Sequence, residues 1–434
     1  MIHQLRDTVT AGFQGLDIAP ALLEMLARLR FTAPTPIQKQ AIPIAIQGKD
    51  LVGIAQTGTG KTLAFGVPMI QRLAQLKQQG LVVLPTRELA LQVDEVLRKV
   101  GGSLGLRTAV LIGGIAIGPQ LKTLGKKPHI IIATPGRLID HLQRKSVRLS
   151  QTHIVVLDEA DRMLDMGFLP QIQKILHALP TERQTMLFSA TMPPAIMKLA
   201  TTWMKLPTAV EIAPSGTTVE RVTQELFIVP REQKLSLLKK LFERHTGPTL
   251  VFMRTKHGAR RVTQQIRAFG VNAAELHSNR SLNQRRAALE GFKLGHYRVL
   301  VATDIASRGI DVVGIELVVN YDLPTSSDDY VHRIGRTARA GAGGHAITFA
   351  MPGEQKEVRG IERFIRKPLP ISKLPDLPVL RIAPVMYPQH PARAVHRAHG
   401  GGASRPPARR FSHTYKGTGG HRQQYGQRRS PSFR

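Results

Sequence analysis

The sequence predicts an α/β fold in which two tandem domains, each built on a parallel sheet, precede a disordered basic C-terminal tail. Three observations support this prediction. Short apolar runs alternate with stretches of helical periodicity, which is typical of parallel sheets covered by helices. One apolar run ends in a glycine-rich loop that opens a helical stretch, as in nucleotide-binding α/β domains. From residue 372 the chain is rich in Gly, Pro, Ser and Arg, a composition that cannot build a packed core.

The apolar runs predict the individual elements and the domain limits. In the first half, the predicted strands are 51–54, 81–84, 109–112, 130–133, 154–157 and 186–189. In the second half, they are 224–229, 249–253, 272–276, 298–302, 316–319 and 346–350. The helices that we expect between them include 88–101, 232–244 and 257–269. A Pro-Ser-Gly-Thr-Thr segment predicts a linker. We therefore expect domains at 1–210 and 219–371, a linker at 211–218 and the tail at 372–434.

Residues 55–62 read AQTGTGKT and predict a phosphate-binding loop. Gly58 and Gly60 permit a tight turn whose backbone N–H groups point at phosphates. Lys61 would reach the β- and γ-phosphates, and the Thr62 hydroxyl would bind Mg²⁺. A strand precedes the loop and a helix follows it, so the positive end of the helix dipole would face the phosphates. The alternative is a glycine-rich turn with a surface lysine.

An acidic run, Asp158-Glu159-Ala160-Asp161, follows the predicted strand 154–157. Ligands of parallel sheets bind at the carboxyl ends of strands, which is where this run begins. Asp158 would hold Mg²⁺ through water, and Glu159 would orient and deprotonate the attacking water. The alternative is a surface acidic turn. Together with the phosphate-binding loop, the run predicts a nucleoside triphosphatase.

Further motifs follow in order along the chain: Pro34–Gln38, Pro85–Ala90, Gly113-Gly114, Thr134–Arg137, Ser189–Thr191, Val251–Thr255, Ala302–Asp311 and His332–Arg339. With these residues the chain resembles the DEAD-box RNA helicases of helicase superfamily 2 over roughly residues 11–370. Its short N-terminal segment and basic C-terminal segment look most like the bacterial RhlE-like group. The resemblance implies two RecA-like domains that use ATP and Mg²⁺ to open RNA locally. It also implies a role in ribosome assembly or RNA turnover.

On the nucleotide side, the resemblance implies that Gln38 reads the adenine edge and that Phe13 stacks on the adenine; Phe13 could instead be an ordinary core aromatic. Arg336 and Arg339 correspond to arginine fingers that reach the γ-phosphate and would act in catalysis with Lys61, Asp158 and Glu159. Asp304 would contact the ribose and Gly309 would line the nucleotide cleft. The loop residues implied to bind the nucleotide are Gln56, Thr57, Gly58, Thr59, Gly60, Lys61 and Thr62.

On the RNA side, the resemblance implies contacts at Thr86, Arg87, Gly114, Thr134, Gly136, Arg137, Arg254, Thr255, Arg285 and Thr303. Guanidinium groups, hydroxyls and bare glycine backbone suit phosphate and sugar, so no base specificity is expected. Each position could instead be a helix cap or a turn residue. Asp161, Ser189, Thr191 and His332 are implied to couple hydrolysis to strand separation, with Ser189 and Thr191 bonded to Asp161. A core histidine is the alternative for His332.

Three positions depart from the family pattern. Arg30 and Ala338 stand where glycines are usual, and Leu282 stands where a glutamine often precedes Arg285 by three residues. The Leu282 departure puts in doubt one contact to RNA or between the domains, whereas the enzyme class is unaffected.

The formal net charge is +31, and residues 372–434 hold twelve basic residues and one acidic residue, with interspersed Tyr and Phe. Charge that follows phosphates and rings that stack on bases predict an RNA-binding tail; a solvated solubility tail is the alternative. We expect single-stranded RNA and short duplexes as partners, together with ribosomal or RNA-decay proteins. An RNA chaperone that acts mainly through the tail is the competing function, and a DNA translocase is disfavoured. The chain has no cysteine, long apolar run or signal-peptide pattern, which predicts a cytoplasmic protein without disulfides, thiolate metal sites or membrane contact.

Overall fold

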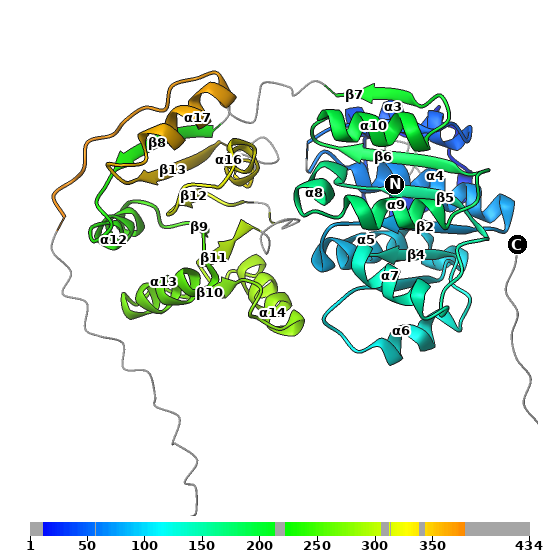
Figure 1. Cartoon of the computed structure of the whole chain (residues 1–434), viewed down its shortest axis with the longest axis horizontal. Coiled ribbons are helices and arrows are strands. Elements are labelled where there is room, and N and C mark those ends of the chain that lie inside the picture. Colours follow the sequence, from blue (N-terminus) through cyan, green and yellow to red (C-terminus); the bar gives the residue numbers. More distant parts are fainter. Residues whose placement is uncertain are drawn as a thin grey trace, which may run out of the picture. The chain divides into compact units, whose positions relative to one another are not determined.

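The computed structural model describes residues 12–56, 58–212, 222–304, 312, 314–337 and 343–377. Two parallel sheets with helices packed on them form the described chain, which confirms the predicted α/β class (Figure 1). The predicted domain limits and linker stay predictions, because residues 213–221 lie outside the described part. No described helix is both long and apolar enough to span a membrane.

The first sheet has seven parallel strands in the order β3-β4-β2-β5-β6-β1-β7. Their bounds are β1 (Leu51–Ile54), β2 (Gln79–Val83), β3 (Thr108–Leu111), β4 (Ile130–Ala133), β5 (Thr152–Leu157), β6 (Gln184–Ser189) and β7 (Thr208–Glu211). The strand β7 has no counterpart among the predicted strands. It is short and only Val210 is buried, so it lacks the apolar run that marked the other six.

The helices of this part are α2 (Pro20–Arg28), α3 (Pro36–Ile46), α4 (Lys61–Leu76), α5 (Arg87–Gly101), α6 (Ile117–Leu124), α7 (Pro135–Gln143), α8 (Ala160–Asp165), α9 (Leu169–His177) and α10 (Pro194–Trp203). A short 3₁₀ turn, η1, covers Gly102–Leu104. Local sequence sets several of their starts. Thr86 caps α5 by accepting a hydrogen bond from Leu89 N at 3.3 Å, and Thr35 with Gln38 forms a capping box on α3.

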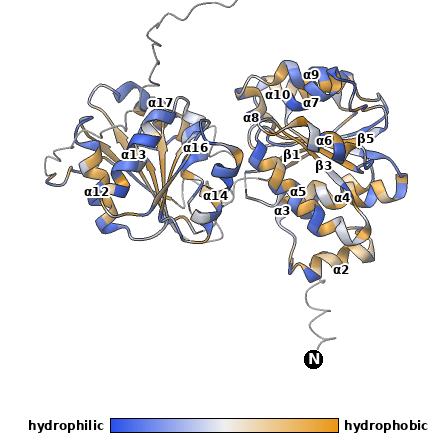
Figure 2. Cartoon of the chain, turned by 90° about the horizontal axis from the view of Figure 1, so that it is seen from below, coloured by the Kyte–Doolittle hydropathy of each residue, from blue (hydrophilic) through white to orange (hydrophobic). Residues whose placement is uncertain are grey.

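The second sheet has six parallel strands in the order β10-β11-β9-β12-β13-β8. Their bounds are β8 (Val222–Ile228), β9 (Thr249–Met253), β10 (Ala273–Leu276), β11 (Val299–Thr303), β12 (Leu317–Asn320) and β13 (Gly344–Ala350). The accompanying helices are α12 (Lys234–Arg244), α13 (Lys256–Ala268), α14 (Leu282–Lys293), α16 (Ser327–Ile334) and α17 (Gln355–Ile365). In Figure 2 the strands of this sheet are mainly orange, while α12, α13, α16 and α17 carry blue outer faces.

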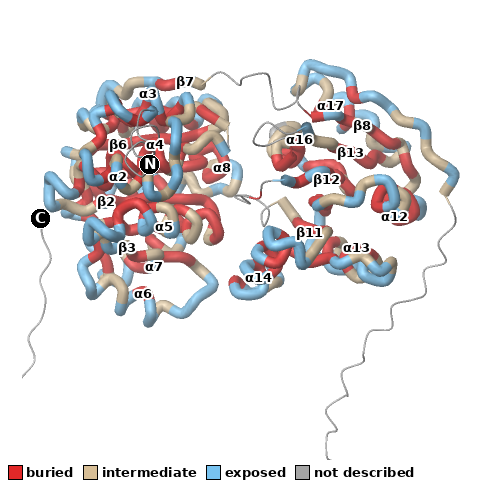
Figure 3. Tube along the Cα trace, turned by 180° about the vertical axis from the view of Figure 1, so that it is seen from behind, coloured by how far each residue is buried: buried red, intermediate tan, exposed pale blue. Residues whose placement is uncertain are grey.

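Both sheets are buried on both faces, as continuous apolar strands require. In β5, Ile154 and Val156 belong to one core cluster, and Val155 and Leu157 belong to another. The same alternation divides β9 between two clusters of the second sheet. Figure 3 shows the strands as buried segments and the outer helical turns as exposed ones.

The first residues of the predicted tail pack against the second sheet. Ser372 N donates to Leu226 O at 2.8 Å, and Ile371 forms an isolated parallel bridge with Leu226. Leu374 and Leu377 are half-buried against the core cluster that contains Phe227. Residues 372–377 are therefore part of the folded domain, and residues 378–434 lie outside the described part.

Candidate functional site

The candidate residues of the first sheet meet at one edge because its parallel strands all end there. The loop before Lys61 follows β1, Thr86 follows β2 and Gly114 follows β3. Thr134 follows β4, Asp158 follows β5 and Ser189 ends β6. Residues more than a hundred positions apart in the sequence thus share one surface of the domain, which is where an α/β sheet binds its ligands.

The loop predicted to bind phosphates has the backbone conformation that its glycines predict. Gly58 and Gly60 have φ of 88° and 89°, a left-handed conformation that glycine adopts without strain. A side chain at Gly60 would also collide with the Gln38 amide. Lys61 is 6 % exposed, and its Nζ donates to Ala55 O at 2.9 Å across the loop. The loop therefore carries its cation inside the turn, at the N-terminus of α4.

Gln38 is held against this loop from both ends of its amide. Its Nε2 donates to Gly60 O at 3.0 Å, and its Oε1 accepts from Thr35 N at 3.0 Å. The predicted adenine-reading side chain thus lies directly beside the phosphate loop. Phe13 is 1 % exposed and packs in the core cluster of the first domain, and its stacking on adenine stays a prediction.

The acidic run is buried and tied to β6. Asp158 and Glu159 are each 3 % exposed, and Glu159 adopts a φ of 53° that turns the chain from β5 into α8. Asp161 accepts from Thr191 N at 2.9 Å and from Thr191 Oγ1 at 3.0 Å, while its own N–H donates to Ser189 Oγ at 3.2 Å. The hydrogen bonds expected between Asp161 and the Ser189–Thr191 segment are present; the coupling role stays a prediction.

The surroundings of Asp158 and Glu159 shift the pKa values of these two carboxyls in opposite directions. Burial raises the pKa of Asp158 to about 6; the negative charges of Glu159 and Asp161 add to this, while Lys61 opposes it. Burial also acts to raise the pKa of Glu159, but the charges of Arg162 and Lys61 outweigh it and hold that pKa below its usual value. Arg162 Nη1 lies 2.9 Å from Glu159 Oε2. Glu159 is therefore kept ionised, the form that can accept a proton.

The loop between β3 and α6 packs against two arginines that were predicted to contact RNA. Arg137 Nη1 donates to Ile115 O at 3.1 Å, and the Arg87 guanidinium lies against Gly114 so closely that no side chain fits there. Gly114 also has a φ of 76°, which favours glycine. Gly136 has no atom within 4 Å of an added Cβ, so backbone is open to solvent at that point.

The buried side chain of Gln120 forms hydrogen bonds to the backbone of the loop between β3 and α6. This residue was not identified from the sequence. Its Oε1 accepts from Ile112 N at 3.1 Å, and its Nε2 lies 3.2 Å from both Ile112 O and Ala116 O. His141 of α7, which is fully buried, lies 3.4 Å from Gln120 Oε1 and 2.8 Å from Ser146 Oγ. Gln120 therefore links the loop that carries Gly114 to the helix that carries Arg137. A lone glutamine six residues after a glycine pair gives no recognisable signal in one sequence.

The second sheet presents a similar edge. Thr255 caps α13 by accepting from Gly258 N at 3.0 Å, and Arg254 N donates to Asp322 Oδ2 at 3.0 Å. Thr303 ends β11 and is half-buried. Arg285 is 8 % exposed, and its Nη2 lies 2.8 Å from a carboxylate oxygen of Glu88. Leu282, the departure from the family pattern, is buried in the first turn of α14.

Asp304 forms a bidentate ion pair with Arg333, a residue that was not identified from the sequence. Arg333 Nε and Nη2 donate to the two Asp304 oxygens at 2.6 and 2.7 Å, and Arg333 is 2 % exposed. Its guanidinium also stacks on Phe252 at 5.0 Å. Arg333 lies inside the His332–Arg339 motif, but nothing in that motif indicates that Asp304 is its partner. Its bidentate pair fixes the carboxylate predicted to contact the ribose.

His332 and Arg336 occupy neighbouring turns at the end of α16. Burial lowers the pKa of His332 to about 4, and the positive charges of Arg162 and Arg336 act in the same direction, so this imidazole is neutral near pH 7. Arg336 is 3 % exposed, and its Nε donates to His332 O at 3.3 Å. Thr57, Gly309 and Arg339 lie outside the described residues, and their roles stay predictions.

Two family models match the chain. A DEAD/DEAH box helicase model covers residues 35–199, and a helicase conserved C-terminal domain model covers residues 233–341. Among similar proteins, a DEAD-box ATP-dependent RNA helicase CshA of Bacillus licheniformis is 42 % identical over 372 residues, spanning 85 % of this chain and 76 % of that protein. An ATP-dependent rRNA helicase RRP3 of Debaryomyces hansenii is 41 % identical over 388 residues, or 88 % and 81 % of the two chains.

Solved structures give the same result at the level of the fold. Dbp5 of S. cerevisiae bound to RNA and ADP BeF3 aligns with a TM-score of 0.75 at 29 % identity, covering 84 % of this chain and 95 % of that one. Mss116p bound to single-stranded RNA and AMP-PNP aligns with a TM-score of 0.76 at 28 % identity, covering 84 % and 79 %. Both of these similar proteins carry RNA and a nucleotide.

Proposed function

The chain belongs to the DEAD/DEAH box helicases and is an ATP-dependent RNA helicase, and we propose that it couples RNA-stimulated ATP hydrolysis to the local opening of short RNA duplexes. Remodelling of RNA–protein complexes would follow from the same opening. Because some relatives are named rRNA helicases, ribosomal RNA is the substrate to test first. In this proposal the first sheet binds ATP, and the carboxyl edges of both sheets contact RNA phosphates and sugars.

One observation carries the proposal: a buried lysine and two buried carboxyls with opposed pKa shifts lie on the same sheet edge as a loop whose glycines have positive φ at the start of a helix. A structural ion cluster would not need a left-handed glycine loop at a helix N-terminus. A simple RNA-binding domain would not need Glu159 kept ionised at 3 % exposure. The combination is that of a hydrolase whose substrate carries phosphates.

The residues fit ATP with Mg²⁺. Thr62 lies in the first turn of α4 and Asp158 directly follows β5, so both oxygen-bearing side chains belong to the carboxyl edge of the first sheet, and oxygen is the ligand that Mg²⁺ prefers. The Thr62 hydroxyl and the Asp158 carboxylate are the oxygen ligands that would hold it. Bound Mg²⁺ would neutralise phosphate charge as it develops.

The other steps belong to the chain itself. The N–H groups of the 55–62 loop and the Lys61 ammonium bind the phosphates, and Gln38 reads the adenine edge. Glu159 orients a water molecule and takes its proton, since its pKa is held low by Arg162 and Lys61. Arg336 stabilises the charge that builds on the γ-phosphate. Asp161, bonded to Thr191, then transmits the change at the γ-phosphate to β6.

Base-pair energies limit how far one cycle can open a duplex. A duplex step costs about 1.4 kcal/mol, by the DNA value, so opening roughly five steps needs about 7 kcal/mol of differential affinity for the closed state. We therefore expect poor unwinding of duplexes longer than one or two helical turns. Efficient ATP-driven opening of a long blunt duplex would overturn this expectation.

The primary test measures ATP hydrolysis with and without single-stranded RNA, with DNA as control, on the full chain and on a chain ending after Leu377. The truncation keeps residues 372–377, because Ser372 and Leu377 pack on the second domain. RNA-specific stimulation of both chains supports the helicase. Loss of all RNA activity on truncation supports instead a chaperone that acts through the basic tail.

Mg²⁺ affinity should depend on the protonation of Asp158. The pKa of this carboxyl is raised to about 6, so the group is ionised at pH 7 and largely neutral at pH 5. Since only the ionised form binds the hydrated ion, the Mg²⁺ concentration for half-maximal hydrolysis should rise about tenfold between pH 7 and pH 5. Mg²⁺ titrations across this range measure it, and Asp158→Asn should remove the part of the dependence that comes from this carboxyl, leaving only the part that comes from the phosphates of ATP. A requirement that stays constant over this range in the unaltered chain would show that Asp158 is not the group concerned.

Loss of Gln120 should weaken RNA binding without disturbing ATP binding. Gln120→Leu removes the hydrogen bonds to Ile112 and Ala116, at a cost of about 1–3 kcal/mol, and frees the loop that carries Gly114. We expect RNA Kd to rise about five- to tenfold if 1–1.4 kcal/mol of this appears in binding.

Gln184→Leu is the matched control for Gln120→Leu. Gln184 is also buried and its Nε2 donates to Ala45 O and Lys49 O at 2.8 Å, at the amino end of β6. It should lose stability without losing RNA affinity, as measured by thermal unfolding and fluorescence anisotropy. Equal losses of RNA affinity in the two variants would contradict a specific role for Gln120.

A further inference from the structure

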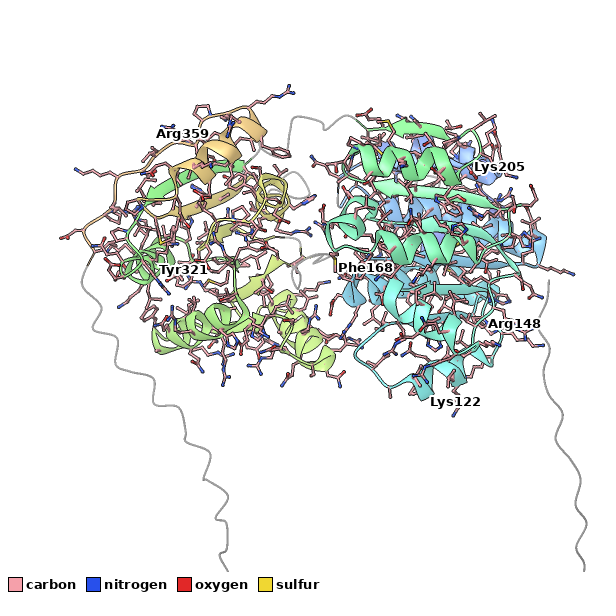
Figure 4. All side chains as sticks on the ribbon, viewed as in Figure 1. Lys122, Arg148, Phe168, Lys205, Tyr321 and Arg359 are labelled. Carbon is pink, nitrogen blue, oxygen red and sulfur yellow. The ribbon has the colours of Figure 1, made fainter. Side chains whose placement is uncertain are left out.

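The outer face of α17 carries a group of cations that the helicase function does not use. Five exposed basic side chains form it, and we name them the α17 stripe: Lys356, Arg359, Arg363, Arg366 and Lys367. All five line one surface groove along the helix and the turn that follows it. Figure 4 shows Arg359 on the outer side of this helix.

Helix geometry places the stripe opposite the core. Val358 and Ile361 are buried, at 6 % and 3 % exposure, and face the second sheet. Lys356, Arg359 and Arg363 are spaced by three and four residues, so they lie on one helix face. They span about 10 Å along the axis at about 1.5 Å per residue. That length corresponds to about three phosphates of a helical strand.

The stripe is not neutralised within the described chain. No ion pair joins any of its five members to a carboxylate among the residues that the structure describes. Some exposed cations on other helices are paired at helical spacing, for example Arg28 with Glu24 and Lys99 with Glu95, so the absence of such a pair along the whole stripe leaves its charge available to a ligand. The α17 carboxylate nearest the end of the stripe, Glu362, accepts from Leu369 N at 2.9 Å. Glu357 is the other acidic residue of α17. The helix carries three basic residues against these two acidic ones, so its net charge is positive.

Two further features distinguish the stripe from an ordinary solvated face. Phe364 is 51 % exposed beside Arg363, an arrangement in which a ring can stack on a base while guanidinium groups contact phosphates. The chain also continues from α17 through residues 372–377, which pack on the same domain, into the segment rich in arginine. The stripe and that segment are therefore consecutive along one chain.

We propose that the α17 stripe is an accessory RNA-binding surface that contacts phosphates of the RNA backbone, separate from the residues at the carboxyl edges of the sheets. This proposal rests on the RNA helicase function. Three of its five members are arginines, whose planar fork binds phosphate with two parallel hydrogen bonds. The stripe raises the affinity of the protein for RNA of any base sequence, and it does not take part in hydrolysis.

The test compares two triple variants of the full chain. Lys356→Gln, Arg359→Gln and Arg363→Gln remove three charges from the stripe. Arg148→Gln, Lys174→Gln and Lys198→Gln remove three exposed charges from the first domain, which carry no ion pair among the described residues. Single-stranded RNA affinity is measured by fluorescence anisotropy between about 50 and 300 mM KCl, a range over which salt increasingly screens contacts between exposed charges. Both variants lose the same net charge, so any difference between them is local.

The stripe variant should lose about two units from the slope of log K against log salt, since each phosphate contact contributes about 0.7. Its Kd at the lowest salt should rise about tenfold or more, while the control variant stays within about twofold. A third variant with Lys356→Arg, Arg359→Lys and Arg363→Lys should keep the slope. In the stripe variant, hydrolysis without RNA and kcat at saturating RNA should both equal those of the unaltered chain.

Two outcomes would overturn the proposal: an unchanged slope, or equal losses in the stripe and control variants. Reduced kcat at saturating RNA would also overturn it, because the stripe would then belong to the coupling machinery. Failure of the helicase function itself is separate, because the unaltered chain would then show no RNA-stimulated hydrolysis. Thermal unfolding of all three variants shows whether a loss of affinity comes from a loss of fold.

Discussion

Glu159→Gln is expected to lower ATP turnover by about 10²- to 10⁴-fold, the range for loss of a positioned general base. The change removes the proton acceptor but keeps the size and one hydrogen-bond acceptor of the side chain. ATP and RNA binding should persist, because Lys61, Gln38 and the loop backbone are untouched. The variant should therefore accumulate in the ATP- and RNA-bound state.

The Glu159→Gln change is also expected to affect stability, because Glu159 is buried and paired with Arg162. Arg162 is 2 % exposed and pairs with Glu159 at 2.9 Å, so the variant leaves a buried guanidinium without its counter-charge. Some stability should be lost, and thermal unfolding will measure how much. Single-turnover hydrolysis, nucleotide affinity and RNA affinity are measured at a temperature where the variant is folded. Turnover within tenfold of the unaltered enzyme would assign the base to another group.

Arg336→Ala should lower kcat by about 10³-fold or more while ATP affinity changes little, because an arginine finger acts on charge that develops only in the transition state. Arg336 is 3 % exposed and bonded to His332 O, so its guanidinium is already ordered. Ordering before the reaction lowers the cost of placing the charge.

Arg336→Lys separates charge from geometry in this test. Lysine keeps the charge and loses the planar fork, so only partial recovery of kcat is expected. Steady-state kinetics at saturating RNA and nucleotide binding measured separately distinguish the two effects. A large loss of ATP affinity in Arg336→Ala, with the fold intact, would show that Arg336 binds the ground state and is not a finger.

The sequence by itself determined the fold class and the position of the candidate residues on the sheet edge, because both depend on local patterns. Apolar runs such as 154–157 must be covered on both faces, and this requirement gives a parallel sheet with helices. The 55–62 loop needs glycines at positive φ, and Gly58 and Gly60 have it. Asp158 and Glu159 follow a strand directly, so their place at the carboxyl edge followed from the order of the residues.

The sequence missed what depends on partners far away in the chain. The strand β7 is short and half exposed, and it exists because it pairs with β1, more than 150 residues earlier. Residues 372–377 have the composition of a tail, yet pairing with Leu226 holds them on the second sheet. Neither pairing leaves a periodic signal in the segment concerned.

The tertiary structure alone decided the electrostatics and the supports of the site. Asp158 and Glu159 are adjacent in sequence, but burial and neighbouring charges raise the pKa of the first, while Arg162 and Lys61 lower that of the second. The roles of Gln120 and Arg333 in positioning the site could not be predicted from the sequence, because their partners, His141 and Asp304, lie 21 and 29 residues away. A motif records which groups are present, whereas burial and the charge of the neighbours exist only once the strands have been ordered in space.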